Sequence, residues 1–546
     1  MIKTKTNMIT KENTDKTGKT NIKTAFTVSD ALGALLYIIA AGLLINCFRL
    51  CAGSDIWYDE IFSMEFVTRP MSEMLAIAAQ DVHPPLYYII VRLAEVIAGG
   101  LNITDSIAVA KFMSVMPYVL LMIYAITILR KKFSMLTAGL FTVMVVGMPQ
   151  MYDMTVEIRM YSWALFFVTA AFIHGILFLQ EHKTGQAVIL LLYGTAACYT
   201  HYYALIATYA LYLGIFIWII VDNKLLSHEN SVLHKSQEDG SRNIMISIAL
   251  PFITAFFYLP WIRIAMSQTA TVSENYWIQP VSLRTIPGCA KYMLLGTFNS
   301  AIWGYIFAAL AACMILVAVA FAISKIREWI SKAVLLGIFV LVMLILGGLV
   351  LSVIIRPVFV YRYMIPALGV FWLAIAISVG SQQKKYLSIA GALIFVIISL
   401  RDYQTFNWSE NYKKELMASA DITLSQITDD TIIICNFNHI QALSSFYLNN
   451  FYEKEDNVNQ IYAYQTEPET LIPVMLEGIE VLGDDADSQI VSFLEQGKKV
   501  LFFGSFNSRE DIVSAWDEQY GITSTYLTEC MVERYWFNVY ELSLSE

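Results

Sequence analysis

Long apolar stretches recur along the first 400 residues of the chain, separated by short polar segments. Each stretch holds close to the ~20 residues that a helix needs to cross the hydrocarbon core of a bilayer. The pattern predicts about eleven transmembrane helices, over residues 31–50, 107–129, 134–149, 160–180, 186–200, 203–221, 244–264, 301–323, 333–355, 358–380 and 386–400. Of the 546 residues, 57% are hydrophobic and 15% charged, which excludes a soluble enzyme and indicates a polytopic α-helical membrane protein.

One further apolar stretch, residues 84–100, does not fit as a membrane span. It is short, contains Arg92 and Glu95, and would reverse the sidedness of every later loop if it crossed the membrane. We therefore predict an amphipathic helix that lies at the membrane interface or re-enters it, with a second, shorter one over residues 71–79. The loop after the first span is then a helical platform.

Positive charges mark alternate loops between the predicted spans. They are Arg130, Lys131, Lys132, Lys183, Lys224, Lys235, Arg242, Lys325, Arg327, Lys332, Lys384 and Lys385. Because cytoplasmic loops are enriched in Lys and Arg, these loops are expected to face the cytoplasm at the plasma membrane. Residues 1–30 are rich in Lys and Thr and lack an apolar core, so we expect a disordered cytoplasmic tail there.

Residues 31–400 are predicted to form the transmembrane domain. After residue 400 the charge and the length of the apolar runs change. Residues 401–546 hold 25 Asp and Glu against 8 Lys and Arg, a net charge of −17. Their apolar runs shorten to strand length at 431–435, 478–482 and 499–503, with helical patterns at 438–449 and 487–496. This alternation predicts a small α/β domain, and an odd number of spans places it outside the cytoplasm. Its acidity argues against nucleic acid as a partner.

Polar residues gather where the chain leaves the membrane on the predicted extracytoplasmic side. They form five short motifs: Trp57-Tyr58-Asp59-Glu60, Asp81-Val82-His83-Pro84-Pro85, Glu157-Ile158-Arg159-Met160-Tyr161, His201-Tyr202-Tyr203 and Tyr361-Arg362-Tyr363. Ionisable groups at a membrane are costly unless they face water, a counter-charge or a polar substrate. We therefore expect the chemistry of this protein at that membrane face.

These five motifs, in this order, resemble those of GT-C-type, family-39-like membrane glycosyltransferases. That group includes the protein O-mannosyltransferases, the aminoarabinose transferases of lipid A and the bacterial RgtA/B/C/D-like proteins, and the resemblance covers residues 30–400. It implies inverting transfer of a sugar from a polyprenyl-phosphate donor to a lipid, glycan or protein acceptor of the cell envelope.

The resemblance also implies roles for the charged residues. Asp59 matches the acidic residue of the family's first loop and is the candidate general base. Glu60 is a second catalytic candidate, or else it anchors the loop or binds a cation. Arg159 and Arg362 are the candidates for binding the donor phosphate, because a guanidinium group offers a planar, permanently charged set of donors.

The remaining candidates would bind substrate. His83 stands where the aminoarabinose transferases have a lysine, and a histidine is only partly charged at neutral pH. Glu157 is expected to pair with Arg159 or to bind sugar hydroxyls. Aromatic faces and polar groups suited to a pyranose come from Tyr87, Tyr88, Tyr161, His201, Tyr202 and Tyr363.

The sequence indicates no bound cofactor. Its seven cysteines are scattered and include no CxxC pair, so a zinc site is not indicated, and no glycine-rich phosphate loop is present. Asp59, Glu60 and Glu157 could together hold a hard divalent cation. The resemblance is closer to metal-independent members, so we expect none.

Two other classes of function stay open at this point. A transporter or lipid flippase would also have many spans, but it would place ionisable groups near the membrane centre. The central parts of these spans are nearly free of charge, which favours the enzyme. A non-catalytic membrane scaffold would not need Asp59, Glu157 and Arg159 together.

Overall fold

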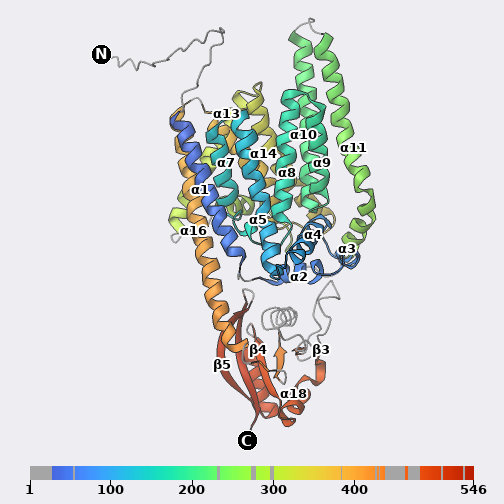
Figure 1. Ribbon diagram of the computed structural model, residues 1–546, viewed down its shortest axis with the longest axis vertical. Helices are drawn as coiled ribbons and strands as arrows, with labels where there is room; N and C mark the ends of the chain where they lie inside the picture. The colour runs from blue at the N-terminus through green and yellow to red at the C-terminus, as the bar shows by residue number, and fades with distance from the viewer. Residues whose placement is uncertain are drawn as a thin grey trace, which may run out of the picture.

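Eleven helices run side by side along the long axis of the computed structural model (Figure 1). The structure describes residues 27–52, 56–229, 234–271, 278–295, 301–382, 384–424, 427–428, 431–436, 461–464, 480–505, 508–532 and 535–545. The long helices are α1 (Val28–Cys51), α5 (Ser106–Tyr124, extended by η1, Ala125–Leu129, and α6, Arg130–Lys132), α7 (Met135–Gly147), α8 (Tyr161–Glu181), α9 (Thr184–Cys198), α10 (Tyr202–Glu229), α11 (His234–Thr271), α13 (Ala301–Ser324), α14 (Trp329–Ile354), α15 (Ile365–Gly380) and α16 (Lys385–Leu424).

Each predicted span corresponds to one of these helices. Within the described residues, nine helices are long and apolar enough to cross a membrane. The other two, α7 and α9, are apolar but have only 13 and 15 residues. The prediction of a polytopic helical protein is confirmed, and the predicted tail lies outside the described residues as far as residue 26.

The short helix α7 lies inside the bundle. Its residues from Leu136 to Gly147 are all buried, so it is apolar on every side, as a helix surrounded by other helices must be. It touches α1 backbone to backbone: a Cβ built on Gly139 would lie 2.0 Å from the carbonyl oxygen of Gly33. Glycine is required there because any side chain would push the two helices apart.

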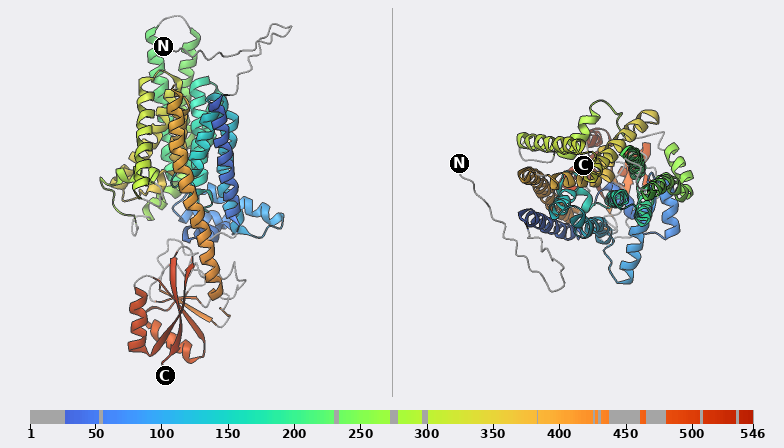
Figure 2. Two further views of the ribbon diagram at one scale, coloured as in Figure 1. Left: turned by 90° about the vertical axis from the view of Figure 1, so that its left-hand side faces the viewer. Right: turned by 90° about the horizontal axis from the view of Figure 1, so that it is seen from above.

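Three short helices form a platform at the end of the bundle that faces the C-terminal domain (Figure 1). They are α2 (Tyr58–Val67), α3 (Met71–Gln80) and α4 (Leu86–Gly100). Seen from above, α4 lies across the direction of the long helices (Figure 2). The helices predicted at 71–79 and 84–100 are thus present, and the predicted platform contains a third helix, α2, which carries Asp59 and whose bounds the sequence did not give.

Three helices are longer than the sequence predicted at their polar ends. The segment 222–243 was expected to be a loop, but α10 and α11 extend into it and project beyond the bundle at the end away from the sheet (Figure 1). The last predicted span, 386–400, is the first part of α16, which continues to Leu424. No Gly or Pro interrupts residues 401–424, so nothing in the chain ends the helix at residue 400.

The C-terminal domain contains one six-stranded sheet. The strands lie in the order β3 (Glu480–Val481), β2 (Ile461–Ala463), β1 (Thr431–Cys435), β4 (Lys499–Gly504), β6 (Tyr535–Leu544) and β5 (Ile522–Val532). The first four are parallel, and β6 and β5 form an antiparallel edge. Helices α18 (Ala486–Glu495) and α19 (Ser508–Ala515) accompany the sheet.

The small α/β domain is confirmed, with differences in detail. The strands predicted at 431–435 and 499–503 are β1 and β4, and the one at 478–482 is the short β3. The helix predicted at 487–496 is α18, whereas the one at 438–449 lies outside the described residues. The antiparallel pair β5 and β6 was not predicted. The chain ends at the far side of this domain from the bundle (Figure 1), so the carboxyl ends of the parallel strands face the platform.

Candidate active site

Asp59 stands in the first turn of α2. The helix begins at Trp57, whose carbonyl oxygen accepts the backbone N–H groups of Glu60 (2.7 Å) and Ile61 (3.0 Å). A carboxylate in a first helical turn is stabilised by the positive end of the helix dipole. The Asp59 side chain is 20% exposed, which makes it accessible from outside.

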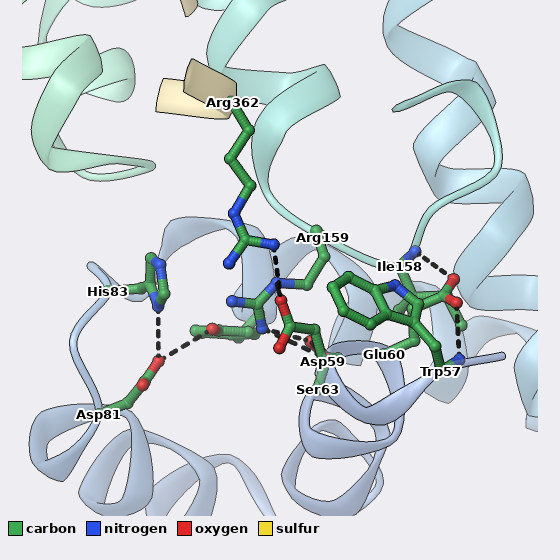
Figure 3. Close-up of polar contacts among 10 residues, drawn as sticks. Trp57, Asp59, Glu60, Ser63, Asp81, His83, Ile158, Arg159 and Arg362 are labelled. Carbon is green, nitrogen blue, oxygen red and sulfur yellow. Dashed lines mark hydrogen bonds and ion pairs between the residues drawn. The ribbon is translucent and has the colours of Figure 1, made fainter. Parts of the chain in front are cut away.

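Two arginines from distant parts of the chain converge on Asp59 (Figure 3). Arg362, in the short helix η3 (Tyr361–Met364) before α15, places Nη1 3.1 Å from Asp59 Oδ2. Arg159, in the turn before α8, places Nε 4.0 Å from the same oxygen. Two guanidinium charges thus face one carboxylate. Asp59, Arg159 and Arg362, called the Asp59 group below, together carry one net positive charge, which can attract an anion.

Both arginines are held in place by further contacts. Arg159 Nη1 donates to the Asp59 carbonyl oxygen at 3.1 Å and lies 3.3 Å from Ser63 Oγ. Arg362 lies over the rings of Trp57 and Tyr161, each 5.9 Å from the guanidinium carbon. Burial opposes the charge on Arg159, but the surrounding acidic groups, Asp59 first and then Tyr88, Tyr161 and Asp81, together outweigh it and raise the pKa of Arg159 further above its usual value.

Glu60 points away from Asp59 (Figure 3). Its Oε2 accepts the backbone N–H of Trp57 at 3.0 Å, which is half of a capping box at the start of α2. Its Oε1 accepts the N–H of Ile158 at 2.8 Å and lies 3.7 Å from Lys111 Nζ. With 1% exposure, Glu60 ties the Asp59 helix to the turn that carries Arg159.

His83 belongs to a second polar group beside the arginines. Its Nδ1 donates to Asp81 Oδ2 at 3.1 Å, and the Tyr88 hydroxyl donates to the same oxygen at 3.1 Å. Burial lowers the pKa of His83 more than Asp81 raises it, so the ring is neutral at neutral pH.

The N–H of Leu86 donates to the Tyr199 carbonyl at 2.9 Å, which fixes the start of α4 beside the end of α9.

His201 and three tyrosines form an aromatic cluster next to His83. The His201 ring centre lies 5.7 Å from that of His83, 5.4 Å from Tyr161 and 5.2 Å from Tyr363. Tyr203 packs on Tyr363 with ring centres 4.7 Å apart. Burial and the nearby positive groups hold the pKa of His201 well below its usual value.

Tyr202 has other surroundings, and Glu157 is buried in the turn that carries Arg159. The Tyr202 hydroxyl donates to the Gln268 side chain of α11, whose amide donates in turn to the Ala78 carbonyl of α3 at 3.0 Å. Tyr202 therefore joins the platform to α11 and does not reach the Asp59 group. Glu157 is 7% exposed, and its carbonyl oxygen accepts the Arg159 N–H at 2.7 Å.

The structure adds three residues that were not among the sequence candidates. Asp81 supports His83 together with the candidate Tyr88, and it stands two residues before His83 in the same motif, so its position gave a signal. Lys111 and Ser63 gave no such signal, because Lys111 is an isolated charge on an apolar helix and Ser63 is one of several polar residues of α2. Only the tertiary packing shows what they contact.

The described residues contain no group of three or more His, Cys, Asp or Glu side chains that could hold a metal ion. The three carboxylates considered from the sequence do not converge on one point. Adjacent residues on a helix point about 100° apart, so Asp59 and Glu60 face different neighbours. Asp59 faces arginines, whereas both Glu60 oxygens accept backbone N–H groups.

Comparison with known proteins places the fold. No protein-family model matches the sequence, and none of the curated proteins matches it. Among solved structures, ArnT from Cupriavidus metallidurans is similar over 93% of this chain and 97% of its own, with 11% identity and a TM-score of 0.51. The chain has a GT-C-type membrane glycosyltransferase fold. This confirms the fold that the five motifs implied.

Two other solved structures extend the comparison. ArnT from the same organism bound to undecaprenyl phosphate matches with the same TM-score of 0.51 and 11% identity, over 93% of this chain and 97% of that one. The Archaeoglobus fulgidus oligosaccharyltransferase, in complex with Zn and sulfate, matches 86% of this chain and 68% of its own. Its TM-score is 0.42 and its identity is 10%.

Proposed function

We propose that this protein transfers a sugar from a polyprenyl-phosphate donor to an acceptor outside the cytoplasm. The observation that carries the proposal is the partly exposed Asp59 carboxylate between Arg159 and Arg362 at one end of the bundle. The GT-C-type fold supports it, as does the undecaprenyl phosphate bound to ArnT, whose fold is similar.

The two arginines would bind the donor phosphate. A phosphodiester carries one negative charge, and the Asp59 group has one positive charge in excess. Guanidinium groups bind phosphate oxygens with short, charge-assisted hydrogen bonds. A phosphate beside Arg362 would compete for the Nη1 donor that now pairs with Asp59 at 3.1 Å, and the carboxylate would become available to the acceptor.

Asp59 would then act as the general base. The acceptor hydroxyl oxygen forms a bond to the anomeric carbon while its proton passes to Asp59. The bond between that carbon and the phosphate oxygen breaks, and its electron pair leaves with polyprenyl phosphate. A single displacement of this kind inverts the anomeric configuration and needs one base. Asp59 suits this role better than Glu60, because Asp59 is partly exposed and Glu60 is buried.

The proposed orientation puts the platform and the sheet domain outside the plasma membrane. The cationic helix ends lie together at the other end of the bundle: Lys132 and Lys183 both pair with Glu181, and Lys332 pairs with Asp222. Positive charge at the cytoplasmic ends of spans is the usual arrangement. The donor lipid would approach from the outer leaflet.

The test is transfer of labelled sugar by the purified protein. It is incubated with undecaprenyl-phosphate-linked hexoses and pentoses and a cell-envelope fraction, and labelled acceptor is measured. We expect transfer by the wild type and a loss of about tenfold or more in the apparent donor affinity of Arg362→Met, since a hydrogen bond to a charged group is removed. Wild-type protein that transfers none of these sugars would contradict the proposal.

Two controls accompany this assay. Arg92→Gln removes an arginine of the platform that donates to the Thr68 carbonyl and lies outside the Asp59 group, so its donor affinity should equal that of the wild type. We further propose that no divalent cation takes part, and transfer should then persist in EDTA. Loss of transfer in EDTA, with recovery on adding Mg²⁺ or Mn²⁺, would overturn that part.

A further inference from the structure

The contacts inside the protein leave one ring nitrogen of the aromatic cluster without a partner. His201 is 2% exposed, and its Nδ1 accepts the backbone N–H of Tyr203 at 3.0 Å. Its Nε2 is buried and has no hydrogen-bond partner within the part of the chain that the structure describes. A buried polar atom of this kind costs free energy unless a ligand or a water molecule binds it.

The local structure determines which nitrogen carries the proton. His201 caps the N-terminus of α10: its carbonyl oxygen accepts the N–H of Leu205 at 3.1 Å, and its Nδ1 accepts the N–H of Tyr203. Nδ1 is therefore an acceptor, and the proton of the neutral ring is on Nε2. Nε2 is an uncharged donor, fixed in direction by the cap.

A second uncommitted group lies on the neighbouring ring. The hydroxyl of Tyr161, a residue that is 1% exposed, has no hydrogen-bond partner within the described residues. The two ring centres are 5.4 Å apart. The site thus has a charged side, with Arg159 and Arg362, and an uncharged side, with His201 and Tyr161.

We infer that His201 Nε2 and the Tyr161 hydroxyl bind uncharged oxygens of the donor sugar and so distinguish the glycosylated lipid from bare polyprenyl phosphate. This inference rests on the proposed function. The arginines contact a phosphate that both lipids carry, whereas neutral donors suit hydroxyl and ring oxygens. Loss of either neutral group should weaken binding of the donor and leave binding of the bare lipid unchanged.

His201→Asn tests the inference with little change to the fold. An asparagine at an N-cap position can accept the Tyr203 N–H through its own side-chain oxygen, but it has no atom at the place of Nε2. The probes are undecaprenyl phosphate and the undecaprenyl-phosphate sugar, among glucose, mannose, galactose and arabinose, that the wild type binds most tightly. Dissociation constants are measured for both on the full-length protein.

We expect the ratio of the two dissociation constants, donor over bare lipid, to rise about three- to tenfold in His201→Asn, as the loss of one neutral hydrogen bond implies. Tyr161→Phe should raise it by a similar factor. Tyr118→Phe is the matched control: that hydroxyl is satisfied by the Met151 carbonyl at 3.0 Å, and the ratio should not change.

Four other results would overturn the inference. An unchanged ratio in His201→Asn, with both lipids bound, would show that Nε2 does not contact the sugar and would leave the proposed function standing. An equal loss of affinity for both lipids would show that His201 acts on the phosphate or on the fold. Wild-type protein that binds neither lipid, or that binds the bare lipid alone, would remove the proposed function and the inference with it.

Discussion

At the scale of single residues, the start of α2 gives two adjacent carboxylates different surroundings. Asp59 is partly exposed and faces two arginines, while Glu60 is buried among backbone N–H groups and Lys111. The sequence placed both acids at the membrane face and favoured Asp59 as the base over Glu60. It could not show what Glu60 contacts, because that depends on how the turn before α8 and the start of α5 pack against α2.

Glu60 is expected to matter more for stability than for chemistry. Glu60→Ala removes the acceptor of two N–H groups and the carboxylate beside Lys111, so we expect the free energy of unfolding to fall by about 3 kcal/mol. Thermal unfolding in detergent measures this. The additional change Lys111→Met should recover part of the loss, and Asp59→Ala should cost less than Glu60→Ala. Equal costs for the two alanine variants would contradict the assignment.

His201 should make stability depend on pH in a defined direction. Its folded pKa lies well below the value of about 6.5 for a free imidazole, so below that pH the unfolded chain takes up a proton that the folded protein does not. Stability therefore falls as the pH drops through this range, by at most about 1.4 kcal/mol per pH unit for one group. His201→Asn should lose less stability than the wild type between about pH 7.5 and 5.5. An identical loss in both proteins would refute this.

At the scale of elements, the apolar runs predicted each long helix of the bundle, because helix length and hydropathy are local properties. The ends of α10 and α16 were missed, since polar residues continue a helix as well as they form a loop when no Gly or Pro intervenes. The start of α11 was missed because its polar residues and Gly240 are typical of a loop. The strands β5 and β6 were missed because polar residues interrupt their apolar ones, whereas β1 and β4 are nearly continuous apolar runs.

The contact between α1 and α7 gives a prediction at this scale. Gly139→Ala places a methyl group against the Gly33 backbone, where the helices have no space, and should destabilise the protein by ~1–3 kcal/mol. Gly42→Ala is the matched control, because nothing lies within 4 Å of a Cβ at that position of α1. Thermal unfolding of both variants decides the matter. A Gly139→Ala protein as stable as the wild type would contradict the close packing.

At the scale of the whole molecule, five motifs from distant parts of the chain meet at one end of the bundle. The regular alternation of spans brings their loops to the same side, which the sequence could predict. The sequence could not predict that Arg362 would pair with Asp59, 303 positions away in the chain, or that the Tyr202 hydroxyl would donate to the Gln268 side chain. Those contacts depend on how α8, α10, α11 and α15 pack.

The proposed sidedness has a direct test in whole cells. Thr104→Cys, in the exposed segment after α4, should react with a membrane-impermeant maleimide added to intact cells. Thr184→Cys, at the exposed start of α9 near the opposite end of the bundle, should react only after the cells are permeabilised. The unsubstituted protein gives the background from native cysteines. The reverse pattern would show that the platform faces the cytoplasm.

The central claim is that Asp59 takes the acceptor's proton while the arginines bind the donor. The most direct measurement compares donor affinity with the rate of sugar transfer in wild type, Asp59→Asn and Glu73→Gln, an exposed carboxylate of the same platform. Asp59→Asn should bind the labelled donor at least as tightly as the wild type, because its arginines are released, yet transfer sugar about 10²- to 10⁴-fold more slowly. Glu73→Gln should match the wild type in both. Transfer at the wild-type rate by Asp59→Asn would contradict the account.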